Sequence, residues 1–172
     1  RFSMATTTFN GPVRSENGFK AVTKSATTGA ITEISTYGGA PVALADGDVT
    51  LTNTTHSGRV LVVPDGTQDN TYTLPTPVAG SMFTFVYGGA AADVTDFIID
   101  AGSDTNFFVG NVAFNDTDDG AASVVFSDGN SNSKLQVNVP GSAVINVMAK
   151  DGTNWYVWGS VTGATAPAFA DQ

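Results

Sequence analysis

Short segments in which apolar and polar residues alternate recur along most of the chain. Leu135, Val137 and Val139, for example, alternate with Gln136 and Asn138. A period of two gives a strand one buried side and one solvent-facing side. On this basis the sequence predicts strands at Val49–Asn53, Arg59–Val63, Thr71–Leu74, Met82–Tyr87, Phe97–Asp100, Phe107–Phe114, Ala122–Ser127, Lys134–Val139, Ala143–Ala149 and Asn154–Gly159.

Turn-forming residues separate these segments, as in Pro64-Asp65-Gly66 and Asp128-Gly129-Asn130. Helix formers are scarce, with five Leu and two Glu in 172 residues, and no segment repeats apolar residues at helical spacing. So many short strands cannot lie in one flat sheet. We therefore expect an all-β protein, an antiparallel β-sandwich of jelly-roll type preceded by an extended N-terminal arm.

The chain divides into three expected regions. Residues 1–36 form the N-terminal arm, in which Phe19–Lys24 and Ala30–Ser35 flank a Gly-containing loop and predict a hairpin. Residues 37–163 form the sandwich body, and residues 164–172 form a loose, Ala-rich C-terminal tail. The length of the chain suits a single domain with one core.

Charge is distributed unevenly between the arm and the rest of the chain. Residues 1–32 hold four basic residues against one acid, a net charge of +3, whereas the remainder carries −12, giving −9 in total. Cationic arms on anionic bodies are typical of assembly proteins, in which the arm binds a neighbour. An anionic body lacks the clustered Lys and Arg that phosphate binding needs, so we expect no nucleic-acid partner. No apolar run approaches the roughly 18–20 residues that span a bilayer, so we expect no membrane partner either.

Candidate catalytic and cofactor-binding residues are few. The chain has no Cys and a single histidine, His56, which lies in a polar turn without a Gly-x-Ser-x-Gly motif. Eight acids are clustered from Asp93 to Asp128 with no base among them, but their spacing does not match an EF-hand loop. Two interpretations of this cluster stay open: the acids lie in solvated loops, or they bind calcium. We expect no enzymatic activity and no cofactor.

Three large aromatic residues lie on the last expected strand of the body. Alternation places Trp155 and Val157 on one side and Tyr156 and Trp158 on the other. Such residues can close the core on one side and meet a neighbouring subunit on the other, or can stack on sugar rings as a glycan platform. Trp155, Tyr156 and Trp158 are therefore candidate subunit-interface or glycan-binding residues.

Two segments resemble those of known structural proteins. The run from Tyr72-Thr73-Leu74-Pro75 to Gly80-Ser81-Met82-Phe83-Thr84-Phe85, followed by Asp151-Gly152-Thr153-Asn154-Trp155-Tyr156-Val157, resembles β-structural proteins of tailed bacteriophages. The opening run from Phe9-Asn10-Gly11-Pro12-Val13-Arg14 to Phe19 is similar to the starts of small head-decoration, or cement, proteins of cyanobacterial and marine phages.

This resemblance implies a homotrimer that binds the outside of an icosahedral capsid at its local three-fold axes and stabilises the shell by bridging neighbouring subunits. It would be assembled in the host cytoplasm, and its partners would be the major capsid protein and further copies of itself. The capsid-contacting arm residues would be Phe9, Asn10, Pro12, Val13, Arg14, Phe19, Lys20 and Lys24. The alternative hypothesis is a tail-fibre or adhesin module that binds host glycans.

Overall fold

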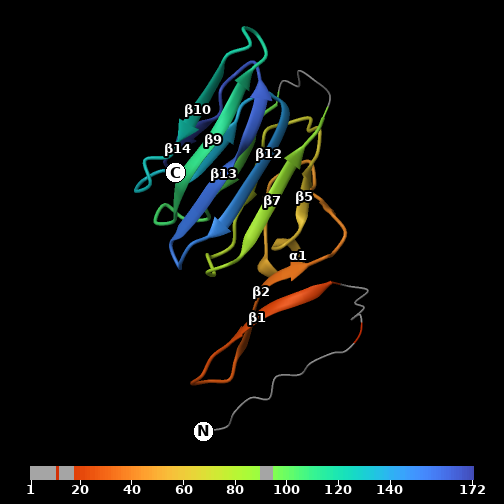
Figure 1. Cartoon of the computed structure of the whole chain (residues 1–172), viewed down its shortest axis with the longest axis vertical. Helices are drawn as coiled ribbons and strands as arrows, with labels where there is room; N and C mark the ends of the chain where they lie inside the picture. Colours follow the sequence, from red (N-terminus) through yellow and green to blue (C-terminus); the bar gives the residue numbers. More distant parts are fainter. Residues whose placement is uncertain (1–10, 12–17, 90–94) are drawn as a thin grey trace.

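The structure, a computed structural model, describes Gly11 and residues 18–89 and 95–172. The expected arm residues Phe9, Asn10, Pro12, Val13 and Arg14 lie outside this range. Within it, the strands form a two-stranded, a seven-stranded and a five-stranded sheet, and the two larger sheets make up the body (Figure 1).

The secondary structure is almost entirely β-strand, as expected. The only helix in the described part of the chain is the single turn α1 (Asn53–His56). The strands are β1 (Phe19–Lys24), β2 (Ile31–Tyr37), β3 (Val42–Ala43), β4 (Val49–Thr50), β5 (Val60–Val63), β6 (Asn70–Thr73), β7 (Met82–Tyr87), β8 (Phe97–Asp100), β9 (Phe107–Asp116), β10 (Ala122–Phe126), β11 (Lys134–Val137), β12 (Pro140–Ala149), β13 (Asn154–Gly163) and β14 (Ala168–Ala170).

From β3 to β8 the chain winds alternately through the two larger sheets. Strands β3, β5 and β7 enter the seven-stranded sheet, whose order is β10-β9-β13-β12-β7-β5-β3, and β4, β6 and β8 enter the five-stranded sheet, whose order is β14-β11-β8-β6-β4. Successive turns of this winding place parallel strands side by side. The long antiparallel hairpin β12–β13 then lies between β7 and β9 (Figure 1).

These pairings confirm an all-β sandwich and correct one part of the expectation. Pairing was expected to be antiparallel throughout, which is wrong, because β9 runs parallel to β13 and the strands of the winding are parallel to one another. For β3 to β8 the physical reason is the crossing between sheets, since a chain that changes sheet at each connection can return to the first sheet in the same direction. Jelly-roll connectivity is the part of the prediction that these pairings do not bear out.

Aromatic side chains fill the space between the two larger sheets. Trp155 is fully buried and meets Phe83 edge-on, with 5.8 Å between ring centroids. Tyr72 of the five-stranded sheet lies 6.2 Å from Phe85 of the seven-stranded sheet. Burying one large apolar side chain contributes about 1.5–3 kcal/mol, so these residues bind the sheets together. Four aromatic residues of the phage-like runs, Tyr72, Phe83, Phe85 and Trp155, therefore serve the core.

The predicted hairpin in the arm is confirmed and is anchored to the body at one end. Strands β1 and β2 pair antiparallel and extend away from the two larger sheets (Figure 1). The anchor is the fully buried Ser57, whose carbonyl oxygen accepts from the backbone N–H of Thr36 at 2.8 Å and whose hydroxyl lies 2.7 Å from that of Ser35. The Ser57 hydroxyl oxygen also accepts from the backbone N–H of Met82 at 3.0 Å. One side chain thus ties β2 to β7.

The prediction of a loose C-terminal tail at residues 164–172 is wrong, because this segment returns to the five-stranded sheet. Strand β14 pairs antiparallel with β11. Phe169 packs against the core, with its ring centroid 6.2 Å from that of Phe108. One aromatic anchor and a short ladder of backbone hydrogen bonds are sufficient to order the segment.

Candidate binding surface

On the outward side of the seven-stranded sheet, six strands carry no charged residue at their outward positions. Residues of β5, β7, β9, β10, β12 and β13 alternate between the core and this side, and strand register aligns them across the sheet. We call the outward set the neutral face; its members are Val60, Val62, Met82, Thr84, Val86, Val109, Asn111, Ala113, Val124, Phe126, Val144, Asn146, Met148, Tyr156, Trp158 and Ser160. None of these residues is an Asp, Glu, Lys, Arg or His, although the chain carries a net charge of −9.

Trp158 lies at the middle of the neutral face between two amide side chains. It is 41% exposed, and its register partners are Asn146 on β12 and Asn111 on β9. The Oδ1 atom of Asn146 accepts a hydrogen bond from the Thr84 hydroxyl at 2.9 Å, which fixes that amide. Phe126, 73% exposed, is the next register partner beyond Asn111. The row therefore presents two accessible rings separated by an amide.

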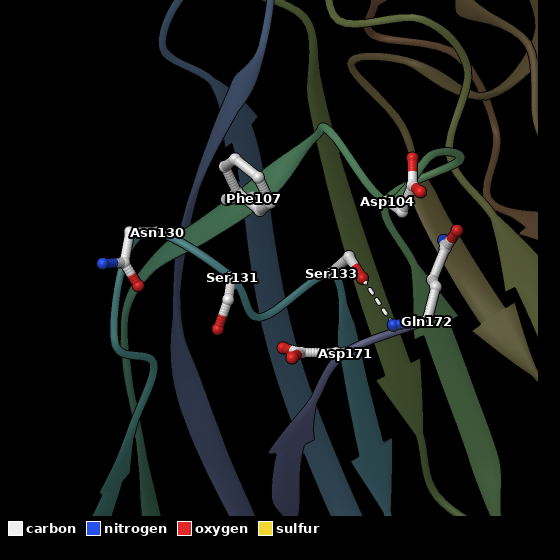
Figure 2. A pocket seen from close by; sticks show the side chains of 7 residues that line it. All are labelled: Asp104, Phe107, Asn130, Ser131, Ser133, Asp171 and Gln172. Atoms are coloured by element: carbon white, nitrogen blue, oxygen red, sulfur yellow. Dashed lines mark hydrogen bonds between the residues drawn. The ribbon is translucent and has the colours of Figure 1, made fainter.

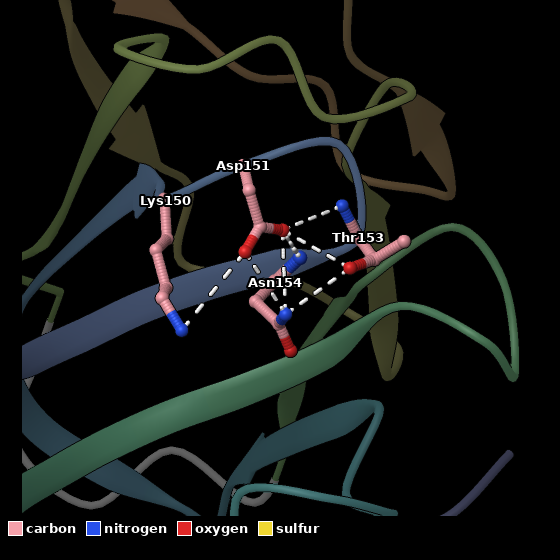
Figure 3. Close-up of polar contacts among 4 residues, drawn as sticks. All are labelled: Lys150, Asp151, Thr153 and Asn154. Atoms are coloured by element: carbon pink, nitrogen blue, oxygen red, sulfur yellow. Dashed lines mark hydrogen bonds and ion pairs between the residues drawn. The ribbon is translucent and has the colours of Figure 1, made fainter.

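The turn before β13 fixes where the exposed aromatic residues begin. Asp151 accepts hydrogen bonds from the backbone N–H of Thr153 at 2.8 Å and of Asn154 at 2.7 Å, and from both of their side chains (Figure 3). These donors, led by the backbone N–H of Thr153, lower the pKa of the Asp151 carboxyl. Lys150, 3.9 Å from that carboxylate, lies 6.0 Å from the centre of the Tyr156 ring. The phage-like motif here is thus a tight turn leading into an aromatic strand.

The three candidate aromatic residues have different positions. Tyr156 and Trp158 are on the neutral face, at 38% and 41% exposure, as alternation predicted. The prediction that Trp155 is a subunit-interface or glycan-binding residue is wrong, because its side chain is fully buried in the core. Only Tyr156 and Trp158 are therefore available to a partner or a sugar.

The β1–β2 hairpin is a second exposed apolar surface. Phe19, Val22, Ile31 and Tyr37 are all exposed, Ile31 the most, at 66%. Lys20 forms an ion pair with Glu33 at 2.7 Å. Of the arm residues proposed to contact a capsid, the structure places Phe19, Lys20 and Lys24 on β1, all exposed.

A cavity of about 290 Å³ connects the base of the hairpin with the neutral face. Tyr37 lines it from β2, and Val60, Met82 and Thr84 line it from the neutral face, together with Gly58 and Arg59. The Arg59 guanidinium donates to the carbonyl oxygens of Ala40 and Thr55. The hairpin and the neutral face are therefore continuous at this point.

His56 has a structural position at the end of α1. Its Nδ1 atom accepts a hydrogen bond from the backbone N–H of Thr52 at 2.9 Å. Burial lowers the pKa of the ring, and the positive charge of the nearby Arg59 lowers it further. Nδ1 also lies 3.3 Å from the hydroxyl and from the carbonyl oxygen of Thr52, the N-cap residue of α1, so the ring folds back on the start of its own turn.

The clustered acids hold turns together. Asp116 accepts from the backbone N–H of Asp118 at 2.8 Å, and Asp119 accepts from that of Ala121 at 2.7 Å. Asp128 accepts from three successive backbone N–H groups and a serine hydroxyl. These are the local hydrogen bonds for which aspartate is favoured in turns. Over residues 18–89 and 95–172, no three His, Asp or Glu side chains are grouped so as to hold a metal ion; Asp93 lies outside the described residues.

A polar cavity of about 300 Å³ lies beside the C-terminus (Figure 2). Asp104 and Asp171 contribute its carboxylates, and Phe107 contributes an aromatic side chain. The Ser133 hydroxyl at its wall accepts the backbone N–H of Gln172 at 2.9 Å (Figure 2). The cavity is therefore partly closed by the chain's own C-terminal residues.

Sequence reasoning missed most of the neutral face. Phe126, Asn111 and Asn146 were not candidates, because the pattern within one strand does not show which residues of other strands lie beside it. The signal available in the sequence was the lack of charge at alternate positions of six strands, but register was needed to place these positions on one surface.

Within the described part of the chain, the four-residue α1 is far too short to cross a membrane as a helix. No protein-family model matches the sequence, and no curated protein matches it. The phage-like segments accordingly remain a resemblance, and the functional argument rests on the surfaces described above.

Proposed function

We propose that this protein is a virion structural protein that binds the outside of an icosahedral phage capsid as a homotrimer and stabilises the shell by bridging neighbouring capsid subunits. The observation that carries the proposal is the pair of exposed apolar surfaces, the neutral face and the β1–β2 hairpin, on an otherwise anionic chain. Exposed apolar patches rimmed by polar residues are typical of protein interfaces. Adhesion without catalysis is part of the proposal.

The hairpin is the element proposed to reach the major capsid protein. It extends away from the body (Figure 1), so its strands can lie on a neighbouring surface without a clash from the two larger sheets. Phe19 and Ile31 provide apolar anchors, and Lys24 provides a cation that forms no ion pair with a described acid. Buried aromatic anchors with charge at the rim are the usual composition of a strong contact. The arm residues before Phe19 extend this proposed contact.

Deletion of residues 1–18 tests the capsid-binding role. The truncated chain is expected to remain folded and self-associated but to co-sediment with phage shells much less than the full chain, because only the hairpin part of the proposed contact remains. The matched variant Lys24→Glu reverses the hairpin charge in the full chain and is expected to weaken shell binding in a salt-dependent manner. Full occupancy of shells by the truncated chain would refute the arm's role.

A glycan-binding adhesin is the second candidate, favoured by the surroundings of Trp158. An exposed indole between Asn111 and Asn146 provides a stacking surface with amide hydrogen-bonding groups on both sides. A glycan array probed with the full chain and with Trp158→Ala tests this function. Binding that is lost in Trp158→Ala would favour the adhesin over the capsid protein.

A further inference from the structure

We propose that the neutral face is the surface through which copies of this chain bind one another. The occupant of the face is a second copy of the chain. This inference rests on the proposed function, because it assigns the surface for the self-association that a homotrimer requires. The β1–β2 hairpin then remains free to bind the shell.

Charge is the first argument for a second copy as the occupant. Each copy carries −9, so contacts through its acidic loops would bring carboxylates of the same sign together. The outward side of the five-stranded sheet also carries ionisable residues, including Asp100 and Lys134. The neutral face spans six strands without a charged member, and the cations beside it, Lys150 near Tyr156 and Arg59 near Val60, lie past the ends of strands. Two copies can therefore desolvate its central part without burying an unpaired charge.

The extent of the neutral face is the second argument. Six strands spaced about 4.8 Å apart span about 24 Å between the outermost strands, far more than one sugar ring covers. The stretch from Val60 to Phe126 is therefore of the size at which protein partners meet. The uncharged residues extend over this whole width and are not confined to the surroundings of Trp158.

The two halves of the neutral face differ, and this suits a ring of copies. Phe126, Tyr156 and Trp158 make one half aromatic, whereas Val60 and Val62 make the far half aliphatic. A three-fold ring needs two different patches on each copy, because its contacts run head to tail. Packing the aromatic half of one copy against the aliphatic half of the next meets that requirement.

Sedimentation velocity of the full chain and of two isosteric charge variants tests the inference. Asn111→Asp and Asn146→Asp each put one carboxylate on the neutral face, and the second keeps the oxygen that accepts from Thr84. Each is expected to weaken self-association at least tenfold, because a charge would be buried in the interface. The control Gln68→Glu adds the same charge on an exposed loop and is expected to associate like the parent.

Quenching of tryptophan fluorescence by iodide gives a second measurement on the same samples. Trp155 is buried, so quenching reports on Trp158, and protection of Trp158 is expected to rise with protein concentration and to be weaker in both Asp variants. A parent chain that stays monomeric at micromolar concentration would overturn the inference. So would unchanged association of both folded Asp variants, or protection of Trp158 in a monomer by a neutral oligosaccharide. Self-association that persists without shell binding would refute the capsid role alone.

Discussion

Replacing Ser57 by alanine should destabilise the contact between the β1–β2 hairpin and the body. The Ser57 hydroxyl is fully buried, accepts the backbone N–H of Met82 at 3.0 Å and lies 2.7 Å from the Ser35 hydroxyl. The substitution removes both contacts and leaves a backbone donor without its acceptor, which costs about 1–3 kcal/mol, with about 1 kcal/mol more for the hydroxyl pair. We expect the free energy of unfolding to fall by about 2–4 kcal/mol.

Urea denaturation and thermal melting measure this loss, and the matched control is Ser160→Ala on the exposed side of β13. For a chain of this size the melting temperature should fall by about 2–4 °C for each kcal/mol. Hydrogen exchange should quicken at Thr36, whose N–H bonds to the carbonyl of Ser57. A loss of stability equal to that of Ser160→Ala would refute the view that Ser57 ties β2 to β7.

Three further predictions concern the body. Gly110→Ala should lower the free energy of unfolding by about 2–3 kcal/mol in urea denaturation, because φ is +139° and the added methyl would collide with the Val157 carbonyl oxygen; an unchanged midpoint would contradict this. Val139→Asn should raise the free energy of unfolding by about 1 kcal/mol, because φ at Val139 is +36° and Asn tolerates that region better than a β-branched residue; a lower free energy of unfolding would show that the position is unstrained. The pKa of Asp128 is lowered, chiefly by the Ser131 hydroxyl and by backbone N–H donors. A carboxyl with a lowered folded-state pKa stabilises the fold above its ordinary value of 3.8 and loses this contribution as the pH falls further. The melting temperature should therefore decline below about pH 4 less steeply in Asp128→Asn than in the parent, and parallel curves would contradict this.

Strand positions could be predicted from the sequence because their signal is local. Alternation located β7 and β11, and Gly and Asp residues marked the turns between strands. Pairing could not be predicted in this way, because it depends on how the chain moves between sheets. Nothing in the sequence of β9 shows that it lies parallel to β13, a strand nearly forty residues later. The parallel pairings were therefore missed.

The candidate surface was only partly predictable for a related reason. A period of two separates Trp155 from Tyr156 and Trp158, but it does not say which side faces the core. The fully buried Trp155 packs against Phe83 of a different strand, a contact that has no local signal. Phe169 was missed for the same reason, because its strand is three residues long and too short to show alternation.

In the proposed role, this chain acts by adhesion to a viral shell and to its own copies. The most direct test of this role is an electron cryo-microscopy density map of phage particles assembled in the presence of the chain. We expect three copies of the two-sheet body around each occupied three-fold axis, with hairpins toward the shell and neutral faces between copies. A body found at the tail, or single copies whose neutral faces meet solvent, would contradict it.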